Sequence, residues 1–291
     1  MQTFKLFIKV SIALFILTFS IKYIIEIFQL KDLSIAYQEL NLILFIAFNT
    51  PLLIFYWIVR TLRLKYLLDD TSSTIPFLKL LQINTFAITT AMFTPFQSGE
   101  ALKIAMLNDL MDYNIKKITA VFVIEKIQDF FILTLMFIVG LLSFQQRDIS
   151  RLEISHFLIL SFVFFALALI SVYFFKYQAK KKFFISFVLS SFSWFIMCFV
   201  WLNTLKSVSL ELDFMHIVFT ISSITFVQIF SFIPMGIGIA EVTIFKLFLS
   251  YGITNEMAKV ATLNLRLMGL YSIILGYILY TILKVYNASK N

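Results

Sequence analysis

Long apolar stretches run through most of this 291-residue sequence and constrain its fold more than any other feature. A helix that crosses a bilayer needs about 20 mostly apolar residues. Six stretches meet that length: 6–28, 40–58, 118–144, 157–177, 183–205 and 263–285. Short polar connectors separate them, and only 14% of the residues are charged, against about a quarter in soluble domains. The sequence therefore predicts an all-α polytopic membrane protein, built as a single integral membrane domain over residues 1–291.

Two further apolar stretches, 75–94 and 217–233, each lead into a Pro-x-x-x-Gly break. The first break contains Pro95 and Gly99, and the second contains Pro234, Gly236 and Gly238. Proline lacks the backbone donor of a helix and glycine allows left-handed φ angles, so a helix does not continue through either segment. Broken backbone is tolerated in hydrocarbon only where protein buries it or where it lines a wet cavity. We therefore expect two re-entrant broken hairpins beside the six spans, which makes eight apolar segments.

The order of these parts repeats along the chain, because two apolar helices, a broken segment and one charge-bearing helix occur twice. If each broken segment returns to the side it entered from, the second half (approximately 146–291) is inverted relative to the first (1–145). A cytoplasmic N-terminus then places 15 lysines and arginines inside and 7 outside, in line with the positive-inside rule. If both broken segments crossed fully, Lys180, Lys181 and Lys182 would lie outside, which fits less well. We therefore predict an inverted-repeat, transporter-like architecture in the cell inner (cytoplasmic) membrane, with both termini cytoplasmic.

Several charged residues lie within or beside the apolar segments and need an explanation. They are Glu100, Glu125, Lys126, Asp129, Glu241 and Arg266. Each costs ~2.5–3.5 kcal/mol at the centre of a membrane helix, so these side chains must pair, face a wet cavity or change protonation. Lys126 can pair with Asp129 three residues on, and Glu125 shares a face with Asp129. One interpretation is a buried ion-pair network that only ties hairpins to helices. The other is a substrate site for a lipid head group.

The head-group interpretation also uses the first break. Ser98 is placed to cap a helix that starts at Gly99 and directs free N–H groups into a cavity. Lys103, one turn further on, suits a phosphate, with a solvated cytoplasmic charge as the alternative. The four acids and two bases of the set carry −2, which suits a cationic group, whereas Lys103 and the helix N-termini favour an anion. A zwitterionic or phosphate-containing lipid head group fits both tendencies.

Other features of the sequence restrict the class of function. The net charge of +8 does not indicate nucleic-acid binding, because the basic residues cluster at segment ends, as topology signals do. The single cysteine, Cys198, lies within an apolar stretch, and His156 and His216 lie apart from the charged segments. The sequence contains no Cys/His metal set and no recognisable nucleophile arrangement. We therefore expect no metal, no cofactor and no catalytic activity.

Four short motifs follow one another in register along the chain. They are Pro95-x-x-x-Gly99-Glu100, Glu125-Lys126-x-x-Asp129, Pro234-x-x-x-Gly238-x-x-Glu241 and Arg266. Together they resemble the lysylphosphatidylglycerol synthase transmembrane, or flippase-like, family over nearly the whole chain. Lys126 stands where that family usually has arginine, which removes bidentate phosphate geometry, and Ala240 stands where a basic residue is common. The resemblance implies a stand-alone lipid-flipping member without a synthase domain, with a phospholipid or polyprenyl phosphate as substrate.

Three functions remain open at this point. The first is a lipid flippase or small-solute secondary transporter with alternating access between inverted hairpins. The second is an integral membrane enzyme that acts on a lipid-linked substrate with these carboxylates as catalysts. The third is a non-catalytic membrane subunit that positions partner proteins of lipid-linked glycan or cell-envelope synthesis. We favour the first, because paired breaks and intramembrane acids are features of a transport site.

Overall fold

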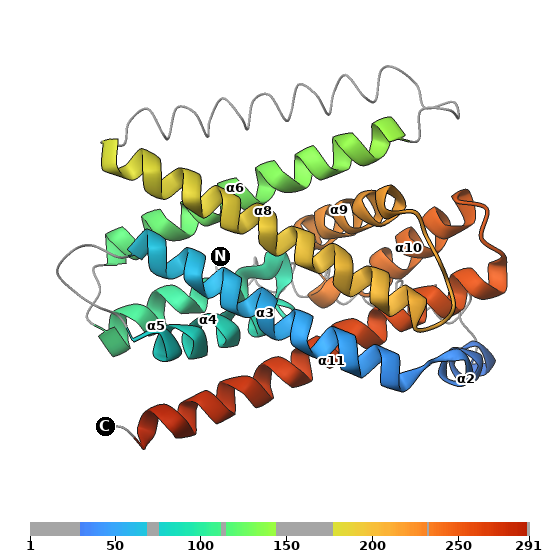
Figure 1. The fold of residues 1–291 in the computed structure, drawn as a ribbon, viewed down its shortest axis with the longest axis horizontal. Coiled ribbons are helices and arrows are strands. Elements are labelled where there is room, and N and C mark those ends of the chain that lie inside the picture. The colour runs from blue at the N-terminus through green and yellow to red at the C-terminus, as the bar shows by residue number, and fades with distance from the viewer. Residues whose placement is uncertain (1–29, 69–75, 112–114, 144–176, 232, 290–291) are drawn as a thin grey trace, which may run out of the picture.

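The computed structural model describes residues 30–68, 76–111, 115–143, 177–231 and 233–289, which are almost entirely helical (Figure 1). The elements in chain order are α2 (Leu30–Glu39), α3 (Leu42–Leu68), α4 (Phe77–Ala91), η1 (Pro95–Ala101), α5 (Leu102–Met111), α6 (Ile115–Ser143), α8 (Tyr177–Lys206), α9 (Phe214–Phe230), η2 (Pro234–Gly236), α10 (Ile239–Ser250) and α11 (Asn255–Ala288). The predicted span 6–28, and all but the last residue of 157–177, lie outside the described residues.

Three of the described helices are long and apolar enough to cross a membrane: α3, the part of α8 from Lys181 to Lys206, and α11. Helix α6 has 29 residues, contains residues 118–143 of the predicted span 118–144, and carries the charged motif that begins at Glu125. The prediction of a helical membrane protein is therefore confirmed. The count of six spans stays a prediction.

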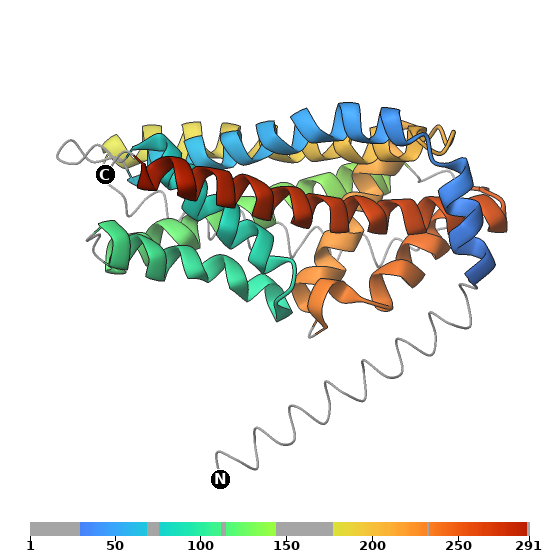
Figure 2. The same ribbon diagram turned by 90° about the horizontal axis from the view of Figure 1, so that it is seen from below.

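Helices α3 and α8 pack along one another and hold much of the core (Figures 1 and 2). Phe45 and Trp57 of α3 belong to the same buried apolar cluster as Trp201 of α8. Between the helices, the side-chain amide of Asn49 donates to Thr204 Oγ1 at 3.0 Å, which satisfies a donor that burial would otherwise leave unpaired. This helix pair is the scaffold on which the polar site is built.

Each broken segment folds back on itself at its 3-10 turn. Helices α4 and α5 lie against each other around η1, and α9 and α10 lie against each other around η2. Figure 1 shows the free ends of α4 and α5 at one end of the molecule and those of α9 and α10 toward the other. The turns η1 and η2 contact each other. The fold therefore contains two helical hairpins that approach from opposite ends and meet about midway along the long axis of the molecule (Figures 1 and 2).

The first break depends on close backbone packing. Helix α4 ends at Ala91, and Thr94 is extended (φ −107°, ψ 141°), as the residue before a proline prefers. A Cβ on Gly99 would lie 2.8 Å from the backbone nitrogen of Ala91, so only glycine fits between the turn and α4. The left-handed residue of this turn is Gln97 (φ 53°), not the glycine. Gly99 is thus needed for its missing side chain rather than for its φ angle.

The expected helix cap at Ser98 is wrong. Ser98 lies inside the 3-10 helix that begins at Pro95, and this helix continues directly into α5. The Gly99 N–H that was expected to point into the cavity instead donates to Thr94 Oγ1 at 2.6 Å. The threonine that precedes the proline, rather than the serine that follows it, therefore satisfies this backbone donor.

The second break does require positive φ angles. Gly236 and Gly238 have φ values of 61° and 90°, and Met235 between Pro234 and Gly236 has φ 58°. The Gly238 N–H donates to Glu241 Oε2 at 2.6 Å, which satisfies an N-terminal donor of α10 and places an acid in its first turn. Glycines here allow the left-handed turn that reverses the chain.

Each hairpin packs against the charge-bearing helix of the other half. Helix α4 lies on α11, and α9 lies on α6. Glycine permits both approaches, because a Cβ on Gly276 would lie 2.2 Å from Thr89 Oγ1, and one on Gly140 would lie 2.7 Å from Phe219 Cβ. In each contact a glycine of the longer helix admits a residue of the hairpin helix.

Candidate functional site

Two arginines on one face of α3 form the centre of a buried ion network. Arg63 contacts both carboxylate oxygens of Asp129, with Nη1–Oδ1 at 2.5 Å and Nη2–Oδ2 at 3.2 Å. Its Nε atom lies 3.1 Å from Glu125 Oε1. Arg60 Nη2 lies 2.8 Å from Glu100 Oε1 and 3.2 Å from Asp129 Oδ2. The network thereby joins α3, the first break and α6.

Two lysines complete the network from the other elements. Lys103 of α5 donates to Glu125 and lies 3.5 Å from Glu100 Oε1. Lys126 of α6 donates to Glu100. Glu100 is therefore contacted by three cations: Arg60, Lys103 and Lys126. Such charge-assisted hydrogen bonds are the strong ones, and in a buried site they also fix geometry.

The network corrects the charge balance expected from the sequence. The charge of −2 expected from the sequence did not include Lys103, Arg60 or Arg63. These three residues were counted instead among the cytoplasmic topology charges. All three side chains are buried and paired, so the network holds four bases and three acids and carries +1. The positive-inside count falls accordingly, because these three residues are not independent topology signals. Lys103 is likewise not the solvated charge that one interpretation expected, since only 1% of it is exposed.

A second, smaller cluster lies at the other break. Arg266 Nε of α11 is 2.7 Å from Glu241 Oε1, and its Nη1 donates to the Met235 carbonyl at 3.1 Å. The Nε contact has the distance of an ion pair without hydrogen-bond geometry, and Nη2 has no hydrogen-bond partner among the described residues. The motif residues of the second half therefore come together around η2, as those of the first half do around η1.

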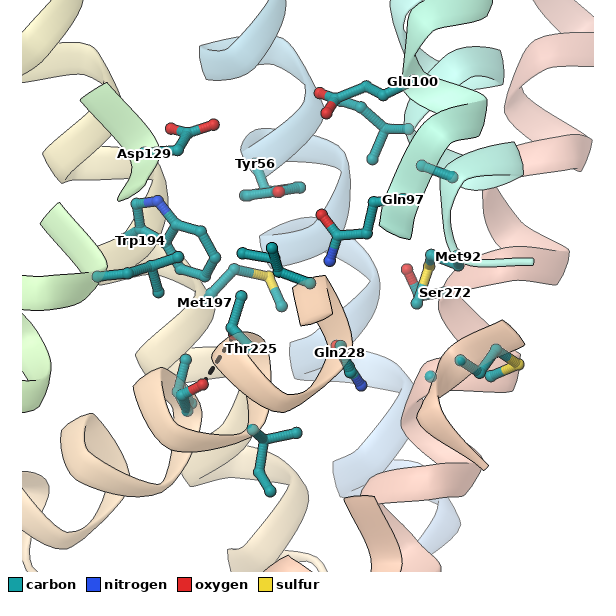
Figure 3. A pocket seen from close by; sticks show the side chains of 18 of the residues that line it. Tyr56, Met92, Gln97, Glu100, Asp129, Trp194, Met197, Thr225, Gln228 and Ser272 are labelled. Carbon is teal, nitrogen blue, oxygen red and sulfur yellow. Dashed lines mark hydrogen bonds between the residues drawn. The ribbon is translucent and has the colours of Figure 1, made fainter. Parts of the chain in front are cut away.

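A cavity of about 590 Å³ lies between the two breaks and contacts both clusters. Its charged lining residues are Arg60, Glu100, Lys126, Asp129 and Arg266. Figure 3 shows Glu100 and Asp129 at one end of the cavity and Thr225 and Gln228 at the other. Three of the charged residues selected from the sequence, Lys103, Glu125 and Glu241, do not line this cavity. Lys103 and Glu241 contact residues that do, whereas the ion pairs of Glu125 within the described residues are with Arg63 and Lys103 behind the wall.

Apart from these charged and polar residues, the walls of the cavity are mainly apolar. Leu53, Ile88 and Met197 contribute to them, and all three tryptophans of the chain line the cavity: Trp57, Trp194 and Trp201. A cavity with apolar walls and a few convergent polar groups is the usual form of a small-molecule site. Among the described residues, no group of three or more His, Cys, Asp or Glu is placed to hold a metal ion.

Sequence reasoning missed Arg60 and Arg63, and the reason is physical. They follow the apolar stretch 40–58 and look like the basic end of a span. Helix α3 continues through them to Leu68, so they keep the helical register of the buried face that includes Asn49 and Leu53. A three- and four-residue spacing that continues past the end of an apolar stretch was the signal available in the sequence.

A family model described as "Lysylphosphatidylglycerol synthase TM region" matches residues 6–180 and 174–276. The chain belongs to this family. The two matched ranges contain all four motifs, since the first includes Pro95 to Asp129 and the second includes Pro234 to Arg266. No curated protein and no solved structure matches the chain. Membership in the lysylphosphatidylglycerol synthase TM-region family indicates a multi-pass membrane protein of lipid-related processes.

Proposed function

We propose that this protein is a lipid flippase of the cytoplasmic membrane, and that a lipid head group crosses through the cavity between η1 and η2. The observation that carries the proposal is this cavity, which is bounded by two helix breaks and contacts five ionised side chains. Intramembrane ionised residues are costly and normally mark a substrate or ion pathway. The family adds that the process concerns lipids.

The packing of the two halves supports a transport cycle. Exchange of α3 with α8, α4 with α9, and α6 with α11 leaves the main contacts of the fold unchanged, because α3 packs on α8, α4 on α11 and α9 on α6. Transporters with inverted repeats place their substrate site where broken helices from the two repeats meet. The opposite approach of the two hairpins in Figure 1 supports such a repeat with re-entrant hairpins. We also propose that the N-terminus is cytoplasmic.

The cavity suits an amphiphile better than a small polar solute. Five charged side chains line it, whereas other parts of its wall present Trp57, Trp194 and Met197. A volume of about 590 Å³ falls within the usual range of ligand sites. A polar head can pair with the charged side chains while the first carbons of the acyl or prenyl chain contact the apolar wall. We propose translocation without a covalent step.

One observation favours a structural role for part of the network. Arg63, Lys103 and Glu125 are buried away from the cavity and join three different helices. This arrangement is what a non-catalytic envelope-synthesis subunit would need to hold its hairpins in place. The two functions differ in the role of Glu100, which lines the cavity. This residue is part of the lipid path only if the protein is a flippase.

Transbilayer movement of lipids tests the proposal. Purified protein is reconstituted into vesicles that contain tail-labelled phosphatidylglycerol, phosphatidylethanolamine or polyprenyl phosphate, and loss of outer-leaflet label is followed after adding a membrane-impermeant quencher. We expect faster exchange than in protein-free vesicles for at least one lipid. Glu100→Gln should abolish the increase, whereas Lys246→Gln, at an exposed lysine that does not line the cavity, should leave it intact. No movement of any of the three lipids, from protein that remains folded, would overturn the proposal.

A further inference from the structure

The ion network has two layers with respect to the cavity. The outer layer lines the cavity and consists of Arg60, Lys126, Glu100 and Asp129. The inner layer lies behind it and consists of Arg63, Lys103 and Glu125. Two bases and two acids make the outer layer neutral, whereas two bases and one acid give the inner layer +1. The excess positive charge therefore lies behind the cavity wall.

Each outer carboxylate has a second partner in the inner layer. Asp129 is held by Arg63 through both oxygens, at 2.5 and 3.2 Å. Glu100 Oε1 lies 3.5 Å from Lys103 Nζ. If Arg60 and Lys126 move away from these carboxylates, Asp129 still contacts Arg63 and Glu100 still lies near Lys103. This matters because an uncompensated buried carboxylate costs several kcal/mol, on the order of 3–5.

Both outer cations line the cavity, and Lys126 is the more accessible of the two. The Lys126 side chain is 35% exposed, whereas the side chain of every other network residue is less than 10% exposed. Arg60 directs its Nη2 atom to both Glu100 and Asp129 at the cavity wall. A guanidinium fork matches the oxygens of a phosphate, and an ammonium group adds a point charge beside it.

We propose that Arg60 and Lys126 form an anion site in the cavity, where a phosphate group binds in exchange for the carboxylates of Glu100 and Asp129. The inference rests on the proposed lipid transport and narrows the substrate to amphiphiles with an anionic head group. A head group of charge −1 neutralises the network, whereas a cationic, aminoacylated head group would raise its charge to +2. In a site of low dielectric that difference selects the anion.

Two buried donors that belong to cavity-lining residues also lack an acceptor within the described part of the chain. The indole Nε1 of Trp194 and Nη2 of Arg266 have no hydrogen-bond partner among the described residues. Both residues line the cavity. An unpaired buried donor is unfavourable, and both of these groups lack an acceptor rather than a donor. The oxygens of a phosphate, or of the glycerol or sugar attached to it, are acceptors of this kind.

Intrinsic fluorescence tests the proposal, because all three tryptophans line the cavity. The full-length protein in an uncharged detergent is titrated with dioctanoyl lipids of equal tail length: phosphatidic acid and phosphatidylglycerol as anions, phosphatidylcholine as a zwitterion, and a trimethylammonium analogue as a cation. Inorganic phosphate serves as a competitor. We expect the anionic lipids to bind at least about tenfold more tightly than the cationic one, as the loss of one charged hydrogen bond implies.

Variants at Lys126 test whether the outer cations cause the preference for anionic lipids. Lys126→Gln should weaken binding of phosphatidylglycerol by about tenfold. Lys126→Arg should keep or strengthen it, because the fork geometry is added while the charge is retained. Lys246→Gln removes an exposed lysine on α10 outside the cavity and should change nothing. If Lys126→Gln does not fold, the arginine variant and the lipid series with the unmodified protein still decide the question.

The outcomes separate this inference from the proposed function. Equal or tighter binding of the cationic lipid overturns the anion site, even if vesicles containing the protein move lipids. If inorganic phosphate competes at the same concentration as the lipid, the site binds a free solute anion. That result overturns the proposal that the site binds a lipid head group. Anion-selective lipid binding without any transbilayer movement supports the site and contradicts the flippase.

Discussion

Arg60 of α3 and Glu100 of the first break form an ion pair of 2.8 Å between Nη2 and Oε1, although 40 positions separate them in the sequence. Both residues line the cavity. The pair couples an apolar spanning helix to the turn of a hairpin, so the position of the break and the electrostatics of the cavity depend on each other.

Removing Arg63 should destabilise the protein strongly. Arg63 is fully buried and contacts both Glu125 and Asp129, so Arg63→Met removes one of the two cations that each carboxylate contacts. We expect a loss of about 3–5 kcal/mol in the free energy of unfolding, measured by thermal unfolding in detergent. The matched control is Lys65→Met on the same helix, since no ion pair of Lys65 is described. Equal stability of the two variants would contradict the buried network.

Gly99 and Gly269 should respond differently to alanine. The Cβ of Gly99→Ala would meet backbone atoms of Thr90 and Ala91 at 2.8 Å, so the hairpin must open at a cost of about 1–3 kcal/mol. Gly269 lies within α11, and its nearest Cβ contact is Met235 Cε at 3.9 Å. Gly269→Ala should therefore be neutral or slightly stabilising, because alanine favours the helix. Thermal unfolding of both variants checks this, and a stable Gly99→Ala protein would contradict the tight turn.

At the contact between α4 and α11, a second substitution should suppress the stability loss caused by Gly276→Ala. Gly276→Ala places a Cβ 2.2 Å from Thr89 Oγ1 and 3.3 Å from its Cβ. The single variant should lose stability by about 1–3 kcal/mol. Thr89→Ala removes the closest atom, so the double variant should recover most of that loss, which appears as a coupling energy in a double-mutant cycle. Additive effects of the two substitutions would show that the helices do not approach as closely as described.

Cysteine labelling should place the starts of α6 and α11, each of which follows a hairpin, on opposite sides of the membrane. Cys198 is buried, so the unmodified protein provides a low background. Ile115→Cys at the start of α6 and Thr254→Cys before α11 are both exposed. In intact cells a membrane-impermeant maleimide should label the second and not the first, with the opposite pattern in inverted vesicles. Labelling of both from one side would contradict the inverted topology.

How far the sequence predicted the structure depends on whether the signal was local. Pro95, Gly99, Pro234 and Gly238 could be identified as breaks, because the backbone chemistry of proline and glycine acts within a few residues. The grouping of Glu125 with Asp129 followed from helical spacing, and the structure places both on Arg63. Arg63 itself was not found, because its partners lie on another helix and its position after an apolar stretch is also that of a topology signal.

The role of Ser98 was mispredicted for a related reason. A serine before a glycine looks like a cap, but the break begins with Pro95 as a 3-10 helix and Thr94 takes the backbone donor. Which of two neighbouring hydroxyls bonds to the backbone depends on the turn geometry. The packing of Gly99 against α4 sets that geometry, and no local pattern reports it.

Reversible blockage of the cavity tests the central claim most directly. Met197→Cys and Gln228→Cys place thiols in the cavity lining on α8 and α9, whereas Ile43→Cys places one on the outer surface of α3, where 83% of the side chain is exposed. Vesicles containing each variant are treated with a bulky, membrane-permeant thiosulfonate, and lipid movement is measured before treatment, after treatment and after reduction. The flippase account predicts that modification at 197 or 228 lowers movement to the rate of protein-free vesicles, that reduction restores it, and that modification at 43 has no effect. Unchanged lipid movement with both cavity thiols fully modified would contradict a path between the two breaks.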